Sequence, residues 1–268
     1  MARTLTIRSS DGIGLITLNR PDAMNTLTGE MLADLGAAYL QCDRDDAVKV
    51  IVITGSGKAF CAGADLSDGG NTFDSSERSD INSCPLAVQA WELRKPIIAA
   101  CNGHAIGVGL SIATQCDVRV VAKDSKYGFL QNRRGVVTDF GMTALLPKIV
   151  GMEAAFELLV RAPKLNGDEL QAIGLASRSV DADHVLDEAL SIAKDMVENC
   201  SPLVMGMHKR LLWDNMDKSL ADAIEHESDG LNYSMRKPDA LEGGVAFFEK
   251  RKPAWQATIN NDWPEFWG

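Results

Sequence analysis

The chain has 268 residues, with 27 Lys and Arg against 37 Asp and Glu, which gives a formal net charge of −10. Because nucleic-acid binding needs a positive surface that neutralises phosphates, this charge excludes a nucleic-acid partner. Hydrophobic residues make up 46% of the chain and charged residues 24%, as in an ordinary folded protein. A chain of this length buries roughly 75% of its unfolded surface, so it needs no disulfide or metal to hold a core.

The cysteines and the N-terminal residues indicate where the protein works. Its six cysteines are scattered without a C-x-x-C pair, which predicts reduced, mostly buried thiols in a reducing compartment. The first ten residues alternate polar and apolar side chains and lack the apolar core of a signal peptide. The longest nearly apolar run, 105–113, is far shorter than the roughly 20 residues of a membrane span. We therefore expect a cytoplasmic protein with no membrane partner.

Strand and helix patterns alternate through the first two thirds of the chain. This alternation predicts an α/β fold with parallel strand pairing. The expected strands are at 5–7, 13–18, 48–54, 97–101, 118–122 and 176–180, and the expected helices are at 27–39, 107–114, 142–149, 153–160 and 168–173.

After about residue 183 the strand patterns stop. Three amphipathic helices are expected at 185–197, 202–212 and 220–235, without a separate core, packing on the α/β body or on another subunit. We expect two regions, 1–183 and 184–268. The polar segment 67–83 predicts a surface loop or frayed helix, and both a plain solvated loop and a substrate gate remain open.

Glycine and histidine patterns give no cofactor or metal site. The glycines around Lys58 do not complete a Walker phosphate loop. The run 103–109 is not a dinucleotide fingerprint, because Ile112 stands where the third glycine would be. The four histidines show no metal-ligand spacing.

Two turns of small residues, 60–66 and 102–109, each follow a strand. Residues this small let a ligand approach the backbone, and a helix that begins at such a turn directs free N–H groups outward. Two such turns that meet would form an oxyanion hole. Spacing alone favours the simpler interpretation, two tight turns that need glycine for their backbone angles.

Five segments resemble, in order along the chain, the enoyl-CoA hydratase/isomerase (crotonase) superfamily. They are LNRPDAMNTL, GSGKAFCAGADL, CNGHAIGVGLSIATQCD, KYGF followed by RRGVV, and AFFEKRKPAW, so the resemblance covers nearly the whole chain. It implies a crotonase-like spiral of ββα units with a C-terminal helical trimerisation region. It also implies homotrimers or dimers of trimers, an acyl-CoA thioester of fatty-acid type metabolism as substrate, and no separate cofactor.

The resemblance also assigns site residues. The backbone N–H groups of Ala64 and Val108 form the hole for the thioester oxygen, although position 108 is commonly glycine. The basic stretch 236–252, with a local net charge of +2, is expected as a tail that reaches CoA on a neighbouring subunit. The positions expected to bind CoA are Ala23, Met24, Ala62, Asp65 and Leu66, together with Phe247 and Lys250 of that tail.

The acid and base positions depart from the hydratases of this superfamily. Ser111 and Gln131 occupy the two places where hydratases carry glutamates, and neither can act as a carboxylate base. Asp139 matches the glutamate base of peroxisomal-type Δ3,Δ2-enoyl-CoA isomerases. The same residue, placed before the apolar run 140–146, also fits the N-cap of a helix.

A single carboxylate favours an isomerase that shifts an enoyl-CoA double bond from Δ3 to Δ2, with Asp139 as base. Alternatives are a hydratase or a carbon–carbon hydrolase that uses Asp139 with water, and a catalytically silent acyl-CoA-binding protein. A dienoyl-CoA isomerase is less favoured because Gln131 replaces its second carboxylate. For Arg133 and Arg134 three placements remain open, facing substrate, pairing with acids or lying on the surface, and pairing with acids is favoured.

Overall fold

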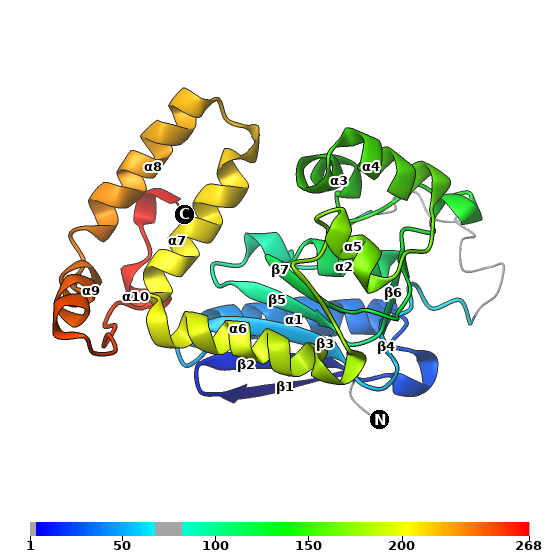
Figure 1. The fold of residues 1–268 in the computed structure, drawn as a ribbon, viewed down its shortest axis with the longest axis horizontal. Helices are drawn as coiled ribbons and strands as arrows, with labels where there is room; N and C mark the ends of the chain where they lie inside the picture. The colour runs from blue at the N-terminus through cyan, green and yellow to red at the C-terminus, as the bar shows by residue number, and fades with distance from the viewer. Residues whose placement is uncertain (1–3, 68–81, 268) are drawn as a thin grey trace.

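A six-stranded sheet forms the centre of the computed structural model, which describes residues 4–67 and 82–267 (Figure 1). Its strands lie in the order β1 (Leu5–Ser10), β2 (Ile13–Leu18), β3 (Val50–Gly55), β5 (Ile97–Cys101), β7 (Val118–Ala122) and β9 (Arg178–Val180). The predicted parallel pairing is confirmed from β2 to β9. β1 pairs antiparallel with β2, because Asp11 and Gly12 both adopt positive φ and form a two-residue hairpin turn.

A second, smaller sheet contains β4 (Ala59–Cys61), β6 (His104–Ile106) and β8 (Tyr127–Gly128). Each of β3, β5 and β7 in the large sheet is followed at once by one of these short strands, and β4 pairs parallel with β6, which pairs parallel with β8. This repeat is the spiral expected from the resemblance. The sequence patterns missed the short strands because two or three residues are too few to show a period of two.

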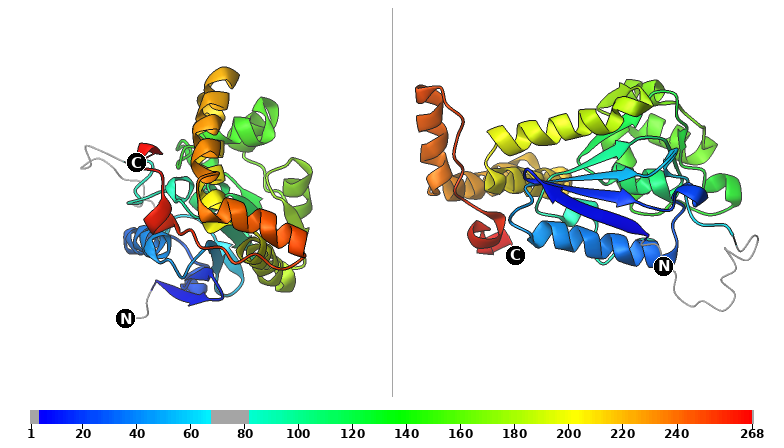
Figure 2. Two further views of the ribbon diagram at one scale, coloured as in Figure 1. Left: turned by 90° about the vertical axis from the view of Figure 1, so that its left-hand side faces the viewer. Right: turned by 90° about the horizontal axis from the view of Figure 1, so that it is seen from below.

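Helices cover both faces of the large sheet, and β3 shows how its sequence permits this. Ile51 and Ile53 pack in one core with α1 (Gly29–Arg44). The alternate residues Val50 and Val52 face a second core that α6 (Val185–Asn199) completes. In Figure 2 the strands lie between α1 and α6. Strands buried on both faces explain why the β3 sequence is continuously apolar.

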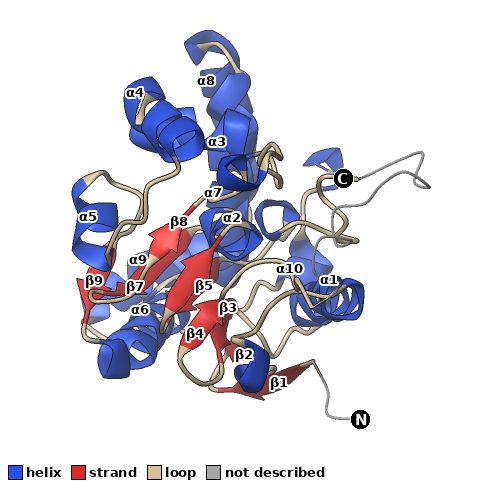
Figure 3. Cartoon of the chain, turned by 90° about the vertical axis from the view of Figure 1, so that its right-hand side faces the viewer, coloured by secondary structure: helices blue, strands red, loops and turns tan. Residues whose placement is uncertain are grey.

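The helices α2 (Val108–Thr114) and α3 (Met142–Val150) lie on the same side of the strands (Figures 1 and 3). They share the α1 core through residues such as Leu110 and Met142. After α3 come α4 (Met152–Phe156), the π-helical turn Glu157–Arg161 and α5 (Gly167–Ala172).

The C-terminal helices form a layer beside the sheet (Figure 1). They comprise α7 (Pro202–Asp214), α8 (Leu220–Ser234), α9 (Pro238–Glu249) and α10 (Ile259–Asp262). The predicted helices 202–212 and 220–235 are confirmed, whereas α9 and α10 are additional. The expectation that this region lacks a core is wrong, because Leu203 and Met207 pack with Ala257 and two tryptophans in a small separate cluster.

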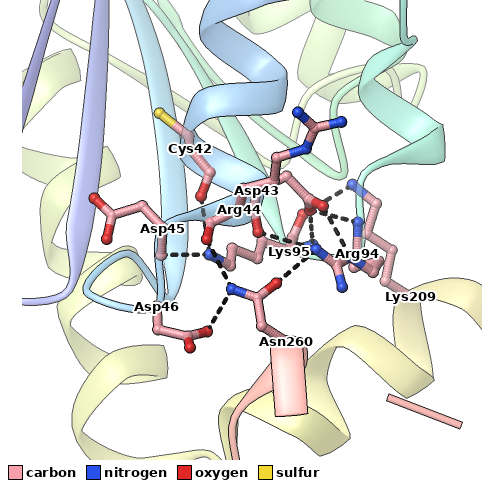
Figure 4. A network of polar contacts seen from close by, with 9 residues as sticks. All are labelled: Cys42, Asp43, Arg44, Asp45, Asp46, Arg94, Lys95, Lys209 and Asn260. Atoms are coloured by element: carbon pink, nitrogen blue, oxygen red, sulfur yellow. Dashed lines mark hydrogen bonds and ion pairs between the residues drawn. The ribbon is translucent and has the colours of Figure 1, made fainter. Parts of the chain in front are cut away.

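A buried polar cluster joins α1, β5 and the C-terminal helices (Figure 4). The fully buried Lys95 donates to two backbone carbonyls at the end of α1, and Asp43 of α1 accepts from Arg94. Lys209 of α7 donates to the carbonyl of Lys95. Asn260 of α10 accepts from Arg94 at 2.9 Å and donates to the carbonyl that closes α1. Each buried charge thus has polar partners, as burial requires.

Three further predictions from the sequence concern the cysteines, the loop 67–83 and membrane-spanning helices. All six cysteines are free thiols, and four of them are buried. Most of the predicted loop 67–83 lies outside the described residues. Across residues 4–67 and 82–267, no helix has the length and apolar character that crossing a membrane requires.

Candidate active site

The two turns of small residues lie side by side at one edge of the second sheet. β4 and β6 are parallel neighbours, so the turns that follow them leave the sheet at the same edge. A Cβ added to Gly109 would lie 2.3 Å from the carbonyl oxygen of Cys61, so α2 packs directly on β4. A Cβ on Gly63 would lie 3.1 Å from the carbonyl oxygen of Ile106. Glycine at these two positions allows the two turns to approach each other closely. As a result, residues 62–64 lie beside residues 107–108.

The two N–H groups expected to form a hole have no acceptor among the described residues. Leu27 binds the backbone on both sides of Ala64, donating to Gly63 and accepting from Asp65, which fixes this residue and leaves its own N–H unused. Val108 is the first residue of α2, where an N–H has no partner within the helix. Gly107, with φ 54° and ψ −125°, makes the turn into this helix. Two free donors at adjoining turns can bind one developing negative oxygen.

A cavity of about 110 Å³ joins these turns to the expected base. It contains the two candidate hole residues, the replaced glutamate position 131 and Asp139. Leu66, expected to bind CoA, also borders it. The lining residues are Ala62, Gly63, Ala64, Leu66, Ile106, Gly107, Val108, Leu130, Gln131, Arg134, Val136, Val137 and Asp139.

Asp139 is partly buried and is held by the two residues at the hydratase glutamate positions. Ser111 Oγ donates to Asp139 Oδ1 at 2.7 Å, and Gln131 Nε2 donates to the same oxygen at 3.2 Å. Burial raises the pKa of Asp139, while the hydrogen bonds from Ser111 and Gln131 oppose part of this rise. A carboxylate with a raised pKa is suited to accept a proton from carbon.

The alternative prediction that Asp139 caps α3 is wrong. The helix begins at Met142, and its N-cap is Gly141, which has positive φ and offers no side chain. Phe140 also has positive φ, so the chain turns between Asp139 and the helix. Only the backbone carbonyl of Asp139 contacts the first turn, where it accepts from Met142. The side chain is therefore available to the cavity.

The residues expected to bind CoA near positions 23 and 62 lie next to each other. The N–H of Ala62 donates to the carbonyl of Met24, which joins the turn after β4 to the turn that contains Ala23. Met24 and Leu66 are exposed.

Asp65 is fixed by a residue whose role the sequence interpretation did not assign. Arg20 donates to its carboxylate at 2.8 Å, and this bond lowers the pKa of Asp65 to about 2. Arg20 also donates to the carbonyl of Thr26, and the Thr26 hydroxyl lies 3.3 Å from the Asp65 carboxylate. The signal that could have found Arg20 is its place in the matching segment LNRPDAMNTL.

Phe247 and Lys250 are not brought to the cavity by their own chain. They belong to the end of α9, which lies at the opposite end of the molecule from β4 and β6 (Figures 1 and 2). Phe247 is 78% exposed. A site that includes these residues therefore requires a second chain.

The expected basic tail is instead mostly helical, and its charges are largely neutralised. Arg251 pairs with Glu242 and Glu249, and Lys252 pairs with Glu198. Glu242 and Glu249 are already counted in the local net charge of +2, whereas Glu198 of α6 lies outside the stretch and reduces the excess by one. The binding of CoA by Phe247 and Lys250 stays a prediction.

Arg133 and Arg134 do not pair with acids in the described part of the chain. Both are exposed, and their guanidinium groups lie 3.4 Å from the backbone carbonyls of Arg161 and Leu130, respectively. Arg134 also borders the cavity. The expected acid pairing is wrong, because no carboxylate of the described residues comes within ion-pair distance of either.

Comparisons with known proteins identify the family of the chain. A model of the enoyl-CoA hydratase/isomerase family matches residues 8–258. The chain is 33% identical over 222 residues to "Probable enoyl-CoA hydratase 1, peroxisomal" of Arabidopsis thaliana, covering 83% of each. It is 34% identical to a probable enoyl-CoA hydratase of Rhizobium meliloti, covering 93% of this chain and 96% of that protein. A solved structure of a probable enoyl-CoA hydratase/isomerase from Mycobacterium abscessus matches with a TM-score of 0.91 and 38% identity, covering 94% and 98%.

Proposed function

The chain belongs to the enoyl-CoA hydratase/isomerase family, and from this membership we propose that it moves the double bond of an enoyl-CoA from Δ3 to Δ2. The observation that carries this proposal is that Asp139 is the one carboxylate among the described residues that line the cavity, beside two N–H donors that have no acceptor within the described part of the chain. The substrate is the acyl-CoA thioester itself, without a further cofactor.

The two hole residues bind the thioester oxygen in this proposal. When a proton leaves C2, negative charge spreads onto this oxygen, where the N–H groups of Ala64 and Val108 stabilise it. Removing one donor of such a pair costs roughly 10²- to 10³-fold in rate in other enzymes. Both donors are fixed by backbone before substrate arrives, so little reorganisation accompanies the reaction.

Asp139 moves the proton. It removes a proton from C2 of a 3-enoyl-CoA, and the same carboxylic acid returns the proton at C4, which leaves the double bond between C2 and C3. One group suffices for both steps. Hydration instead needs one group to take a proton from water and another to deliver a proton to carbon, and Ser111 and Gln131 are not carboxylates.

Hydration is the second candidate, because the relatives in Arabidopsis and Rhizobium are named as hydratases. Asp139 would then activate a water molecule, as it would in a carbon–carbon hydrolase. The positions near Met24 and Leu66 would hold CoA in either reaction, and also in a catalytically silent binding protein.

A substrate panel separates these candidates. The enzyme is mixed with a 3-enoyl-CoA, a 2-enoyl-CoA or a dienoyl-CoA, and the near-ultraviolet absorbance of the conjugated enoyl thioester is followed. Isomerisation of the 3-enoyl-CoA raises this absorbance, whereas hydration of the 2-enoyl-CoA lowers it. Binding without turnover of any substrate would establish the silent binding protein.

Asp139→Asn tests the base, since it keeps the size of the side chain and removes its ability to take a proton. We expect the rate of isomerisation to fall by roughly 10²- to 10⁴-fold. Wild-type isomerisation in this variant would refute the assignment.

We also propose a homotrimer or a dimer of trimers, built through the C-terminal helices. A groove of about 740 Å³ between α7 and α8 is lined mainly by apolar side chains, and Ile224 and Leu231 on α8 are exposed. A contiguous apolar surface of this kind favours burial against another chain. A second copy is its expected occupant, because the exposed Phe247 and Lys250 then reach a neighbouring active site.

A further inference from the structure

We propose that Ser111 and Gln131 are positioning residues that hold Asp139 by one oxygen, Oδ1, and leave Oδ2 to take and return the substrate proton. This inference rests on the proposed isomerase function and assigns a task to the two residues that interrupt the hydratase pattern. It also predicts that both proton transfers take place on the same face of the substrate.

The asymmetry of the hydrogen bonds carries the proposal. Both donors, Ser111 Oγ at 2.7 Å and Gln131 Nε2 at 3.2 Å, bind the same carboxylate oxygen. Apart from the main-chain amide of Asp139 itself, no other group among the described residues hydrogen-bonds to this carboxylate. Oδ1 therefore accepts from both side-chain donors and Oδ2 accepts from neither, so we assign the proton transfer to Oδ2.

Ser111 and Gln131 lie on or beside the segments that form the oxyanion hole. Ser111 is fully buried and follows Val108 by about one turn of α2, so one short helix carries a hole donor and a support of the base. The close approach of Gly109 to Cys61 prevents this helix from sliding on β4. The amide of Gln131 lies 3.9 Å from where a Cβ on Gly107 would be. The distance between hole and base is thus fixed by packing.

The chemistry follows from the neutral character of both donors. They favour the ionised carboxylate, which burial disfavours, and they add no second acid or base. In the first step the C2–H bond breaks, the proton binds Oδ2, and its electron pair enters the thioester dienolate. In the second step the Oδ2–H bond breaks, a C4–H bond forms, and the double bond settles between C2 and C3. A single oxygen above one face of the dienolate makes both transfers suprafacial.

The test compares Ser111→Ala and Gln131→Ala in the full-length enzyme, with a 3-enoyl-CoA as substrate. We expect kcat to fall about ten-fold in each, as loss of a hydrogen bond to a charged group predicts. The acid limb of the kcat/KM profile should move to higher pH, because each variant removes a donor that favours the ionised form. A merely structural role would leave this limb in place.

Thr114→Val is the matched control. It removes a buried hydroxyl from the same helix, but that hydroxyl bonds only to the carbonyl of Leu110. Its acid limb should stay where the wild-type limb lies. With a substrate carrying deuterium at C2, the wild type should deliver part of the label to C4 on the same face. Label on the opposite face contradicts the single-oxygen shuttle.

The pH dependence of the free energy of unfolding reports the ionisation of Asp139 without any substrate turnover. The free energy of unfolding is measured against pH for the wild type, Ser111→Ala and Gln131→Ala, each with and without Asp139→Asn. In each pair, the difference between the two free energies changes with pH as Asp139 ionises. The pH at the midpoint of this change should be higher in Ser111→Ala and Gln131→Ala than in the wild type. Unmoved midpoints and acid limbs overturn the positioning inference, even where Asp139→Asn abolishes activity. Full activity in Asp139→Asn overturns the proposed function instead, so the two failures are distinguishable.

Discussion

The guanidinium of Arg20 lies 2.8 Å from the carboxylate of Asp65, across 45 positions of sequence. The same side chain donates to the backbone carbonyl of Thr26. These bonds hold the turn that contains Ala64, one residue before Asp65, which lines the cavity and whose N–H has no acceptor among the described residues. Arg20 thereby fixes a candidate hole donor without lining the cavity itself.

Arg20→Met should weaken turnover while the fold persists, because it keeps the apolar stem and removes the ion pair. Misplacement of a reacting group by about 1 Å can cost about 10²-fold in rate, so we expect kcat/KM to fall between ten- and a hundred-fold. Arg8→Met, which changes an arginine of β1 away from the site, is the control. An unchanged kcat/KM in Arg20→Met would show that the turn holds its shape alone.

The same pair predicts a pH dependence of stability. Arg20 lowers the pKa of Asp65 to about 2, so the stabilisation is present above the pKa that Asp65 has in the unfolded chain. It disappears as pH falls through about 2. The stability difference between wild type and Arg20→Met, measured by urea unfolding, should therefore shrink as pH falls from neutral towards that value. A difference that grows in acid would contradict the ion pair.

Asp139 should behave in the opposite sense. Burial raises its pKa, so the folded state binds this proton more tightly than the unfolded state does, and ionisation costs stability as pH rises through the raised pKa. Asp139→Asn should therefore unfold at neutral pH with a free energy equal to or above that of the wild type, although it is inactive. Marked destabilisation of the variant at neutral pH, measured by urea unfolding, would contradict this assignment.

Gly109→Ala should damage both stability and activity. Its Cβ would meet the carbonyl oxygen of Cys61 at 2.3 Å, so α2 must move away from β4. Overpacking of this kind typically costs about 1–3 kcal/mol, and the shift should also separate the hole donors. Gly29→Ala is the control, since nothing lies within 4 Å of a Cβ at the start of α1. Thermal unfolding and kcat of the two variants provide the comparison.

Leu231→Glu should dissociate the proposed oligomer. The residue is 61% exposed in the single chain, and a charge buried at a subunit interface without a partner is strongly unfavourable. Sedimentation velocity should show a loss of trimer. Met152→Glu places the same charge on an exposed residue of α4, outside the groove between α7 and α8, and should leave the trimer intact. An unchanged sedimentation coefficient in Leu231→Glu would exclude this face as the interface.

Periodicity and breaker residues were sufficient to predict the long elements. The apolar strand β3 and the amphipathic helices α6 and α7 each contain several repeats of their pattern, and their predicted bounds differ from the observed ones by a few residues. Strands such as β8, with two residues, exist because they pair with a neighbour that the local sequence does not reveal. The charge pattern of 236–252 does not by itself predict the helix α9.

In the candidate site, too, some features could be predicted from local sequence and others depend on tertiary contacts. The small-residue turns were visible in sequence, but only the close approach at Gly109 shows that they lie side by side. Asp139 was identified by resemblance, while its local sequence favoured a helix cap. The positive φ of Phe140 and Gly141 decides against the cap, and no propensity scale anticipates a positive φ at phenylalanine.

The contacts of Asn260 have a consequence for the order in which the protein is completed. Its amide binds the end of α1 across 216 positions of sequence, and its carbonyl oxygen accepts from Arg94. During synthesis from the N-terminus, α1 and β5 emerge long before residue 260, so the polar cluster around Lys95 lacks this partner until residue 260 has been made. Until then Asp43 of α1 is the partner of Arg94, and the carbonyl at the end of α1 must be hydrated, so this part of the cluster can close only after α10 has emerged.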